Sequence, residues 1–115
     1  IYSMARTPQN YAHNKQLDAT PVIIVPLVVQ NTSAVVRKLS FYNSGTVNRA
    51  VTVYIVEASG TADTKNTEVV KSIPPGKTWN VIEIQGEILE TGMTVQAKQD
   101  AGADVNANCS GADIT

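Results

Sequence analysis

Apolar and polar residues alternate along most of this chain from residue 21 onward. The period is two, with every second residue apolar or small. Successive side chains of a β-strand point to opposite faces of its sheet, so this period predicts strands that each bury one face. No segment has helical periodicity. The predicted strands are 22–25 (continued by 27–29 after a kink), 34–42, 49–57, 68–73, 78–85, 93–98 and 105–110.

Turn-forming residues separate these strands. Asn-Ser-Gly-Thr at 43–46 joins two of them and predicts an antiparallel hairpin. In 74–77, Pro75 and Gly76 suit the central positions of a type II turn. Short strands with turn signals at about 8–12 residue spacing are typical of two-layer all-β folds. The sequence therefore predicts a single antiparallel β-sandwich or jelly-roll-like small barrel of seven to eight strands.

Two strands depart from the simple pattern. Pro21 and Pro26 bracket 22–25, which predicts an edge strand or a bent one. Arg37 falls on the apolar face that the alternation assigns to Val35, Leu39 and Phe41. We expect Arg37 either to extend its charge to solvent or to pair with a buried carboxylate. The candidate partners are Glu57 and Glu83.

In the predicted strand 78–85, alternation puts Ile82 and Ile84 on one face and Val81 on the other.

Residues 1–20 lack this alternation of apolar and polar residues and are rich in Asn and Gln. We therefore divide the chain into an extended N-terminal arm, 1–20, and a β-sandwich domain, 21–115. The arm either lies across a neighbouring subunit or is a frayed terminus. Its candidate protein-contact residues are Tyr2, Met4, Tyr11 and Leu17.

Length and charge narrow the function classes. The chain has 115 residues, a formal net charge of −1 and a sequence pI near 5.7, which fits one domain. Its cations are scattered rather than arranged in a basic stripe, so nucleic acid is not an expected partner. The longest apolar run, 22–29, is too short to span a membrane and is broken by Pro26. No secretory signal is apparent, and the chain begins at Ile1.

Few residues suit catalysis or metal binding. The only histidine, His13, lies in the predicted arm, and the only cysteine, Cys109, is expected as a small buried hydrophobe. With one cysteine, no disulfide can form within the chain, which favours folding in a reducing compartment. Asp100 and Asp104 flank a turn but lack the spacing of a known calcium loop. We expect no enzyme activity, no cofactor, no metal and no small-molecule ligand.

The large aromatic residues leave one binding alternative open. Trp79 and Tyr54 could form a sugar-binding platform if they were exposed beside polar loops. Aromatic residues make up only 5% of the chain, which favours packing in the core or an interface instead.

Several segments resemble small structural proteins of tailed bacteriophages. The segments are VVRKLSFYNSG (35–45), VTVYIV (51–56), SIPPGKT (72–78), ILETGMTVQA (88–97) and NCSG (108–111). Those proteins are short β-sandwiches found on virions as head decoration, neck or tail accessory components. The resemblance covers residues 32–115 and has no counterpart for the predicted arm.

This resemblance implies a capsid decoration (cement) protein. Such a protein binds the head surface and stabilises it, here through the β-sandwich and the N-terminal arm. The implied partners are the major capsid protein or other virion proteins, with a homo-oligomer, for example a trimer, as the bound form. The implied location is the virion, after synthesis in the host bacterial cytoplasm. The alternatives are a neck, collar or tail accessory protein and a carbohydrate-binding adhesion module.

Overall fold

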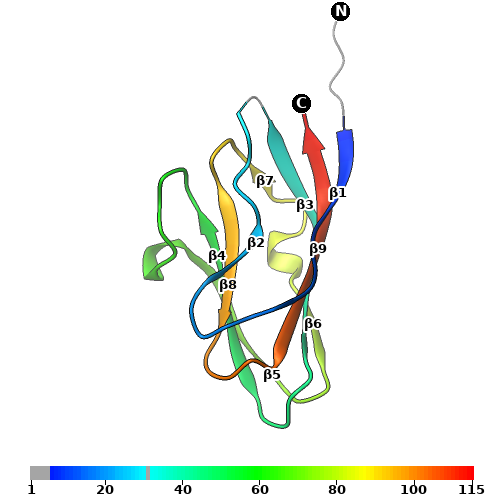
Figure 1. Cartoon of the computed structure of the whole chain (residues 1–115), viewed down its shortest axis with the longest axis vertical. Helices are drawn as coiled ribbons and strands as arrows, with labels where there is room; N and C mark the ends of the chain where they lie inside the picture. Colours follow the sequence, from blue (N-terminus) through cyan, green and yellow to red (C-terminus); the bar gives the residue numbers. More distant parts are fainter. Residues whose placement is uncertain (1–5, 31) are drawn as a thin grey trace, which may run out of the picture.

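Nine strands form two antiparallel sheets in residues 6–30 and 32–115, which are the residues that the computed structural model describes (Figure 1). One sheet has the order β1–β9–β3–β6, with β7 also paired to β3, and the other has the order β2–β8–β4–β5. The strands are β1 (Arg6–Gln16), β2 (Val22–Val25), β3 (Ser33–Asn43), β4 (Arg49–Val56), β5 (Thr67–Ile73), β6 (Thr78–Asn80), β7 (Ile88–Leu89), β8 (Thr94–Gln99) and β9 (Val105–Ile114).

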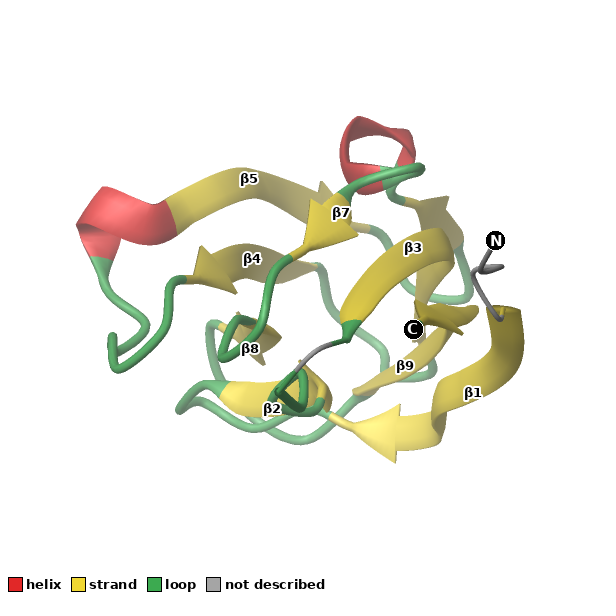
Figure 2. Cartoon of the chain, turned by 90° about the horizontal axis from the view of Figure 1, so that it is seen from above, coloured by secondary structure: helices red, strands yellow, loops and turns green. Residues whose placement is uncertain are grey.

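The two sheets face each other as the layers of a sandwich (Figure 2). Consecutive strands lie in opposite sheets at every step except β4 to β5 and β6 to β7. Such alternation between two layers is the jelly-roll arrangement. The predicted all-β sandwich with jelly-roll character is therefore confirmed, with β1 and the two-residue β7 as additions to the predicted strands. The strand β2, bracketed by Pro21 and Pro26, lies at a sheet edge as predicted.

The predicted hairpin between 34–42 and 49–57 is wrong. The strands exist, but β3 and β4 lie in different sheets and do not pair. Asn43, with no exposed surface, holds the connection that crosses between the sheets. Its side-chain Nδ2 donates to the carbonyls of Val47 and Ile73, each at 2.8 Å, and its Oδ1 accepts from the Gly45 amide at 2.9 Å. These bonds stabilise a crossover where local turn residues alone suggest a hairpin.

The predicted strand 78–85 is correct only in its first part. The chain leaves β6 at Asn80 and forms a short 3₁₀ turn, η2 (Ile82–Ile84). Ile82 is therefore 72% exposed while Val81 and Ile84 are buried, which differs from the predicted faces. The predicted type II turn before β6 is confirmed, because the Lys77 amide donates to the Pro74 carbonyl and Gly76 has a φ of 71°.

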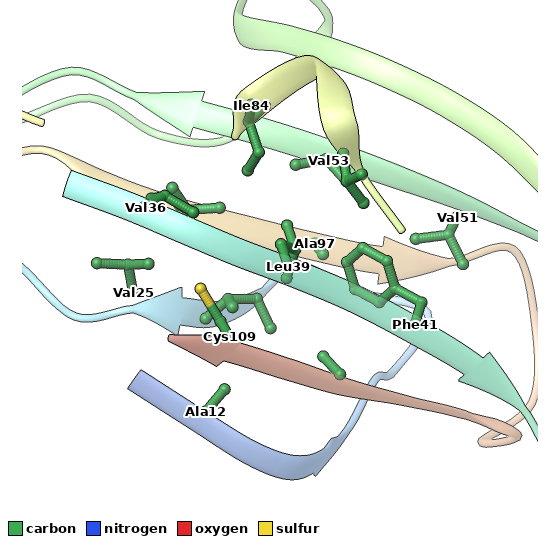
Figure 3. Packing of buried hydrophobic residues seen from close by; sticks show 14 of the residues in the cluster. Ala12, Val25, Val36, Leu39, Phe41, Val51, Val53, Ile84, Ala97 and Cys109 are labelled. Atoms are coloured by element: carbon green, nitrogen blue, oxygen red, sulfur yellow. The ribbon is translucent and has the colours of Figure 1, made fainter. Parts of the chain in front are cut away.

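The core lies between the sheets and is built by the inward residues of both (Figure 3). Phe41 from β3 stacks on Trp79 from β6, with ring centres 5.6 Å apart. Trp79 and Tyr54 are each 5% exposed, and Cys109 is 2% exposed. The prediction that Trp79, Tyr54 and Cys109 pack inside is confirmed. No helix of the described residues has the length and hydrophobicity needed to cross a membrane.

A β-bulge accounts for the position of Arg37. Val36 pairs with Gly111, and Lys38 pairs with Ser110, so Arg37 has no opposite residue on β9. The extra residue shifts the alternation, so Val36 and Leu39 both point inward although their spacing is odd. Arg37 is exposed and has no ion pair with a described residue. The first of its two expected outcomes, a charge in solvent, is therefore correct, and a buried partner at Glu57 or Glu83 is not needed.

The predicted N-terminal arm lies largely within the sandwich. Residues 6–16 form β1, which pairs with β9 from Arg6 opposite Ile114 to Gln16 opposite Asn106. On its inner side Ala12 is 5% exposed, and Leu17, which follows the strand, is 1% exposed. The boundary at residue 20 is therefore wrong for this segment. Its polar sequence is compatible with a strand because an edge strand buries few side chains. Residues 1–5 lie outside the described residues.

Candidate protein-contact site at the open end of the sandwich

A cavity of about 220 Å³ opens at the end of the sandwich where β9 finishes. Its walls come from β1, β9, the start of β3 and the segment that follows β2. One wall is polar and carries Gln9, Tyr11 and Asp113, while the opposite wall is apolar and carries Pro26, Leu27 and Val29. The site is therefore amphipathic, a property that proteins use to bind other proteins and small ligands.

The polar wall is fixed by hydrogen bonds to one carboxylate. The Tyr11 hydroxyl donates to Asp113 Oδ1 at 2.7 Å, and the Gln9 amide Nε2 donates to Oδ2 at 3.1 Å. Burial raises the pKa of Tyr11 well above its usual value, and the hydrogen bond and charge of Asp113 raise it further. Tyr11 therefore stays protonated near neutral pH and acts as a donor. The Asp113 charge is held in one position at the mouth of the cavity.

The apolar wall is held by the turn between β7 and β8. The Val28 amide donates to the Met93 carbonyl at 3.2 Å, and the Gly92 amide donates to the Val28 carbonyl at 2.8 Å. The Thr91 hydroxyl lies 3.1 Å from the Thr32 carbonyl and 3.3 Å from the Val29 carbonyl, within donating distance of both. Leu27 and Val29 are nevertheless each 62% exposed. The chain thus presents two aliphatic side chains to solvent on a segment with a fixed backbone.

Two of the four predicted contact residues are among the described residues, and one of these two lies at this site. Tyr11 lines the cavity. Leu17 belongs to the core and is not available to a partner, so its assignment is wrong. Tyr2 and Met4 lie outside the described residues.

Sequence reasoning missed Leu27, Val29 and Asp113. The signal for the first two was the proline before them, which ends β2 and turns every second residue of the following segment outward. Asp113 carried no local signal, because its role depends on Tyr11 and Gln9 from the other end of the chain.

The other residues considered for chemistry do not form a reactive group. His13 is exposed, and its ring Nε2 lies 3.4 Å from the side-chain amide of Asn14. Asp104 and Asp100 both face Arg49, at 2.8 and 3.9 Å, so a cationic side chain already occupies the place between these two carboxylates. Within 6–30 and 32–115, no three potential metal-binding side chains come together.

Comparisons with known proteins show the fold of this chain. No family model and no curated protein matches it. A subunit of Bacillus endospore appendages, described as disulfide-linked pili, is 16% identical with a TM-score of 0.50, over 98% of this chain and 87% of the pilus chain. A protein of the infectious bursal disease virus Gx strain is 12% identical with a TM-score of 0.50, over 96% of this chain and 32% of the viral chain.

These two structures come from a pilus and a virus particle, both of which are assemblies. This chain spans about a third of the viral chain. At such low identity the likeness establishes the two-layer fold alone. The chain therefore shares a two-layer β fold with a pilus subunit and a viral protein.

Proposed function

We propose that this chain is a structural protein of a bacteriophage virion, which decorates the capsid and stabilises it by binding the head surface. The observation that carries the proposal is the open end, where the exposed Leu27 and Val29 line the same cavity as the fixed Asp113 carboxylate. Apolar contact supplies most of the affinity in such surfaces, and polar groups at the rim set the orientation of the partner. The partner is the major capsid protein or another virion protein, and catalysis has no part in the proposal.

The single cysteine favours non-covalent assembly. A filament linked throughout by disulfides needs at least two cysteines on each subunit, because every subunit must bond to the one before it and the one after it. This chain has one. Cys109 is also 2% exposed, and burial raises its pKa to about 12. A thiol that stays protonated and covered is a poor nucleophile for disulfide exchange.

The sugar-binding alternative loses its main support. It required an exposed ring at Trp79 or Tyr54, and both rings are 5% exposed. Trp79 is covered on one side by Phe41 and lies 5.8 Å from the Lys71 ammonium. Neither ring is free to stack on a sugar.

The test is co-sedimentation of the full chain with phage heads stripped of it. Leu27→Asp places a charge in the proposed contact, where burying a leucine contributes roughly 1.5–3 kcal/mol. We expect the apparent affinity to fall at least about tenfold. Val70→Asp is the matched control, because Val70 is 56% exposed and lies on β5, at the other edge of the sheet that contains β2.

The outcomes separate the alternatives. Equal loss of binding in both variants, or none in Leu27→Asp, contradicts the role of the open end. An electron cryomicroscopy map of the copurifying particle then gives the location. Density spread over the shell supports decoration, whereas density confined to one ring of about six or twelve copies indicates a neck, collar or tail protein. A chain that associates with no particle contradicts the whole proposal.

A further inference from the structure

The bulge on β3 presents two adjacent cations on one surface. Arg37 is the extra residue of the bulge, and Lys38 follows it opposite Ser110. Both side chains are exposed. Bulges are features that redirect side chains, and they are frequent next to functional sites. The regular strand would have pointed one of these two residues toward the core, so the bulge is the reason that both charges reach solvent.

The segment around η2 frames this pair. The Val36 amide donates to the Glu87 carbonyl at 2.9 Å, and the Val36 carbonyl accepts from the Gly86 amide at 2.7 Å. Three residues further on, the Leu39 carbonyl accepts from the Val81 amide at 2.9 Å. The η2 turn lies between these two attachment points. Residues of the bulge, of β6 and of the η2 segment line an open surface cavity of about 350 Å³.

The groups around this cavity share a chemistry. Arg37 and Lys38 supply positive charge, and Asn80 and Gln85 supply side-chain amides on the same lining. Ile82, also on the lining, is 72% exposed. Arginine presents a planar fork of donors that matches a carboxylate, and lysine adds a mobile point charge. The site thus combines recognition of carboxylates with one apolar contact.

Arg37 and Lys38 form no ion pair with another described residue. The ion pairs found in the described part of the chain both involve Arg49, which faces Asp100 and Asp104. A nucleic acid is a poor match for the site, because two adjacent cations neutralise few phosphates and the chain as a whole carries a net charge of −1.

We propose that this framed cavity binds an acidic protein segment of the particle. Its carboxylates lie against Arg37 and Lys38, and one aliphatic side chain of the segment packs on Ile82. This inference rests on the proposed function, since it supplies a second contact to the same particle at a site distinct from the open end. The open end carries a carboxylate, whereas the framed cavity carries cations, so the two sites select opposite charges.

The first test uses a synthetic peptide as the probe, acetyl-Gly-Asp-Glu-Leu-Asp-Gly-amide, titrated into the isotope-labelled full chain. We expect NMR shifts confined to the residues of the framed cavity. The isosteric peptide with Asn and Gln in place of Asp and Glu has no charge and should produce no such shifts. The double variant Arg37→Gln, Lys38→Gln should bind the acidic peptide about three- to tenfold more weakly.

A matched variant controls for net charge. Lys15→Gln, Lys65→Gln removes the same two charges from exposed positions elsewhere and should bind the acidic peptide as the parent chain does. Unfolding temperatures of both double variants should match the parent, which excludes misfolding. The inference is overturned if both double variants weaken binding equally, if the neutral peptide binds as well, or if a DNA oligonucleotide at the same salt shifts the same residues more strongly.

The second test separates this inference from the proposed function. Co-sedimentation with heads is measured between about 50 and about 500 mM salt, because screening weakens exposed charge pairs over this range. We expect the parent to lose affinity with salt and the Arg37→Gln, Lys38→Gln variant to have a flatter dependence. Binding to heads with an unchanged salt dependence in this variant overturns the framed-cavity inference alone. No binding of the parent at any salt overturns the proposed function.

Discussion

Replacing Gly111 with alanine tests the packing of the sheet that holds the open end. Gly111 lies on β9 opposite Val36, next to the bulge. A Cβ at this position would lie far inside contact distance of the Val35 carbonyl oxygen and 2.9 Å from Cε2 of Tyr11. The ring can tilt, but the carbonyl belongs to a paired strand and can move only if β3 and β9 separate. Overpacking of this kind costs typically 1–3 kcal/mol, and more when backbone is displaced.

We therefore expect Gly111→Ala to reduce the free energy of unfolding by about 3 kcal/mol. The corresponding fall in Tm is on the order of 10 °C for a domain of this size. Urea unfolding followed by Trp79 fluorescence measures the first quantity, and circular dichroism measures the second. Trimming the ring with Tyr11→Leu should not rescue the variant, because the carbonyl contact remains.

Gly76→Ala is the control. Gly76 has a φ of 71° and open space around its Cα, so alanine there meets backbone strain but no atom. We expect a loss of about 1 kcal/mol. A Gly111→Ala variant within about 0.5 kcal/mol of the parent would refute the close approach of β9 and β3 at the bulge.

Three further predictions concern buried groups. Burial raises the pKa of Cys109 to about 12, so the thiol loses its proton at a lower pH in the unfolded chain than in the folded one. Between pH 8 and 10 the free energy of unfolding of the parent should therefore fall by about 1.4 kcal/mol more than that of Cys109→Ala. Asn43→Ala removes three hydrogen bonds from the crossover and should lower the free energy of unfolding, measured in urea, by about 3 kcal/mol. A decrease below about 1 kcal/mol would contradict the role of Asn43 in the crossover. Leu17→Ala should cost about 2–5 kcal/mol, because Leu17 is a core residue, and an unchanged Tm would restore the arm interpretation.

The strands with regular alternation were the predictable part of this fold. In β8 and β9 the inward residues Val95, Ala97, Val105 and Ala107 have no exposed surface, as their spacing predicts. Each of these strands buries only one of its two faces, so apolar and polar residues alternate along its sequence. The Pro-Pro-Gly-Lys turn was predictable for a similar reason, since its residues determine its backbone angles locally.

Strand pairing was not predictable from the same signals. The turn at 43–46 is equally compatible with a hairpin and with a crossover between sheets. The choice depends on Asn43 reaching Ile73, thirty positions away. Long-range contacts of this type decide topology in jelly-roll folds, and a single sequence does not display them. The strand β1 was missed for a related reason, because its partner β9 lies at the opposite end of the chain.

The bulge at Arg37 interrupts the alternation of inward and outward side chains along β3 and thereby affects both candidate contact sites. An unbroken β3 would keep Val35, Leu39 and Phe41 on one face and leave Val36 on the other. Instead the extra residue lets Val36 and Phe41 fill the same core while two cations face outward.

Gly111 lies opposite Val36 beside this bulge. Because Gly111 has no side chain, there is room for the ring of Tyr11. The Tyr11 hydroxyl in turn donates to Asp113 at the open end. A single residue out of pattern thus changes the strand phase, exposes the charges of the framed cavity and lies beside the glycine on which the open end depends. Deleting Arg37 should therefore disturb both sites together, whereas Arg37→Gln should affect only the framed cavity.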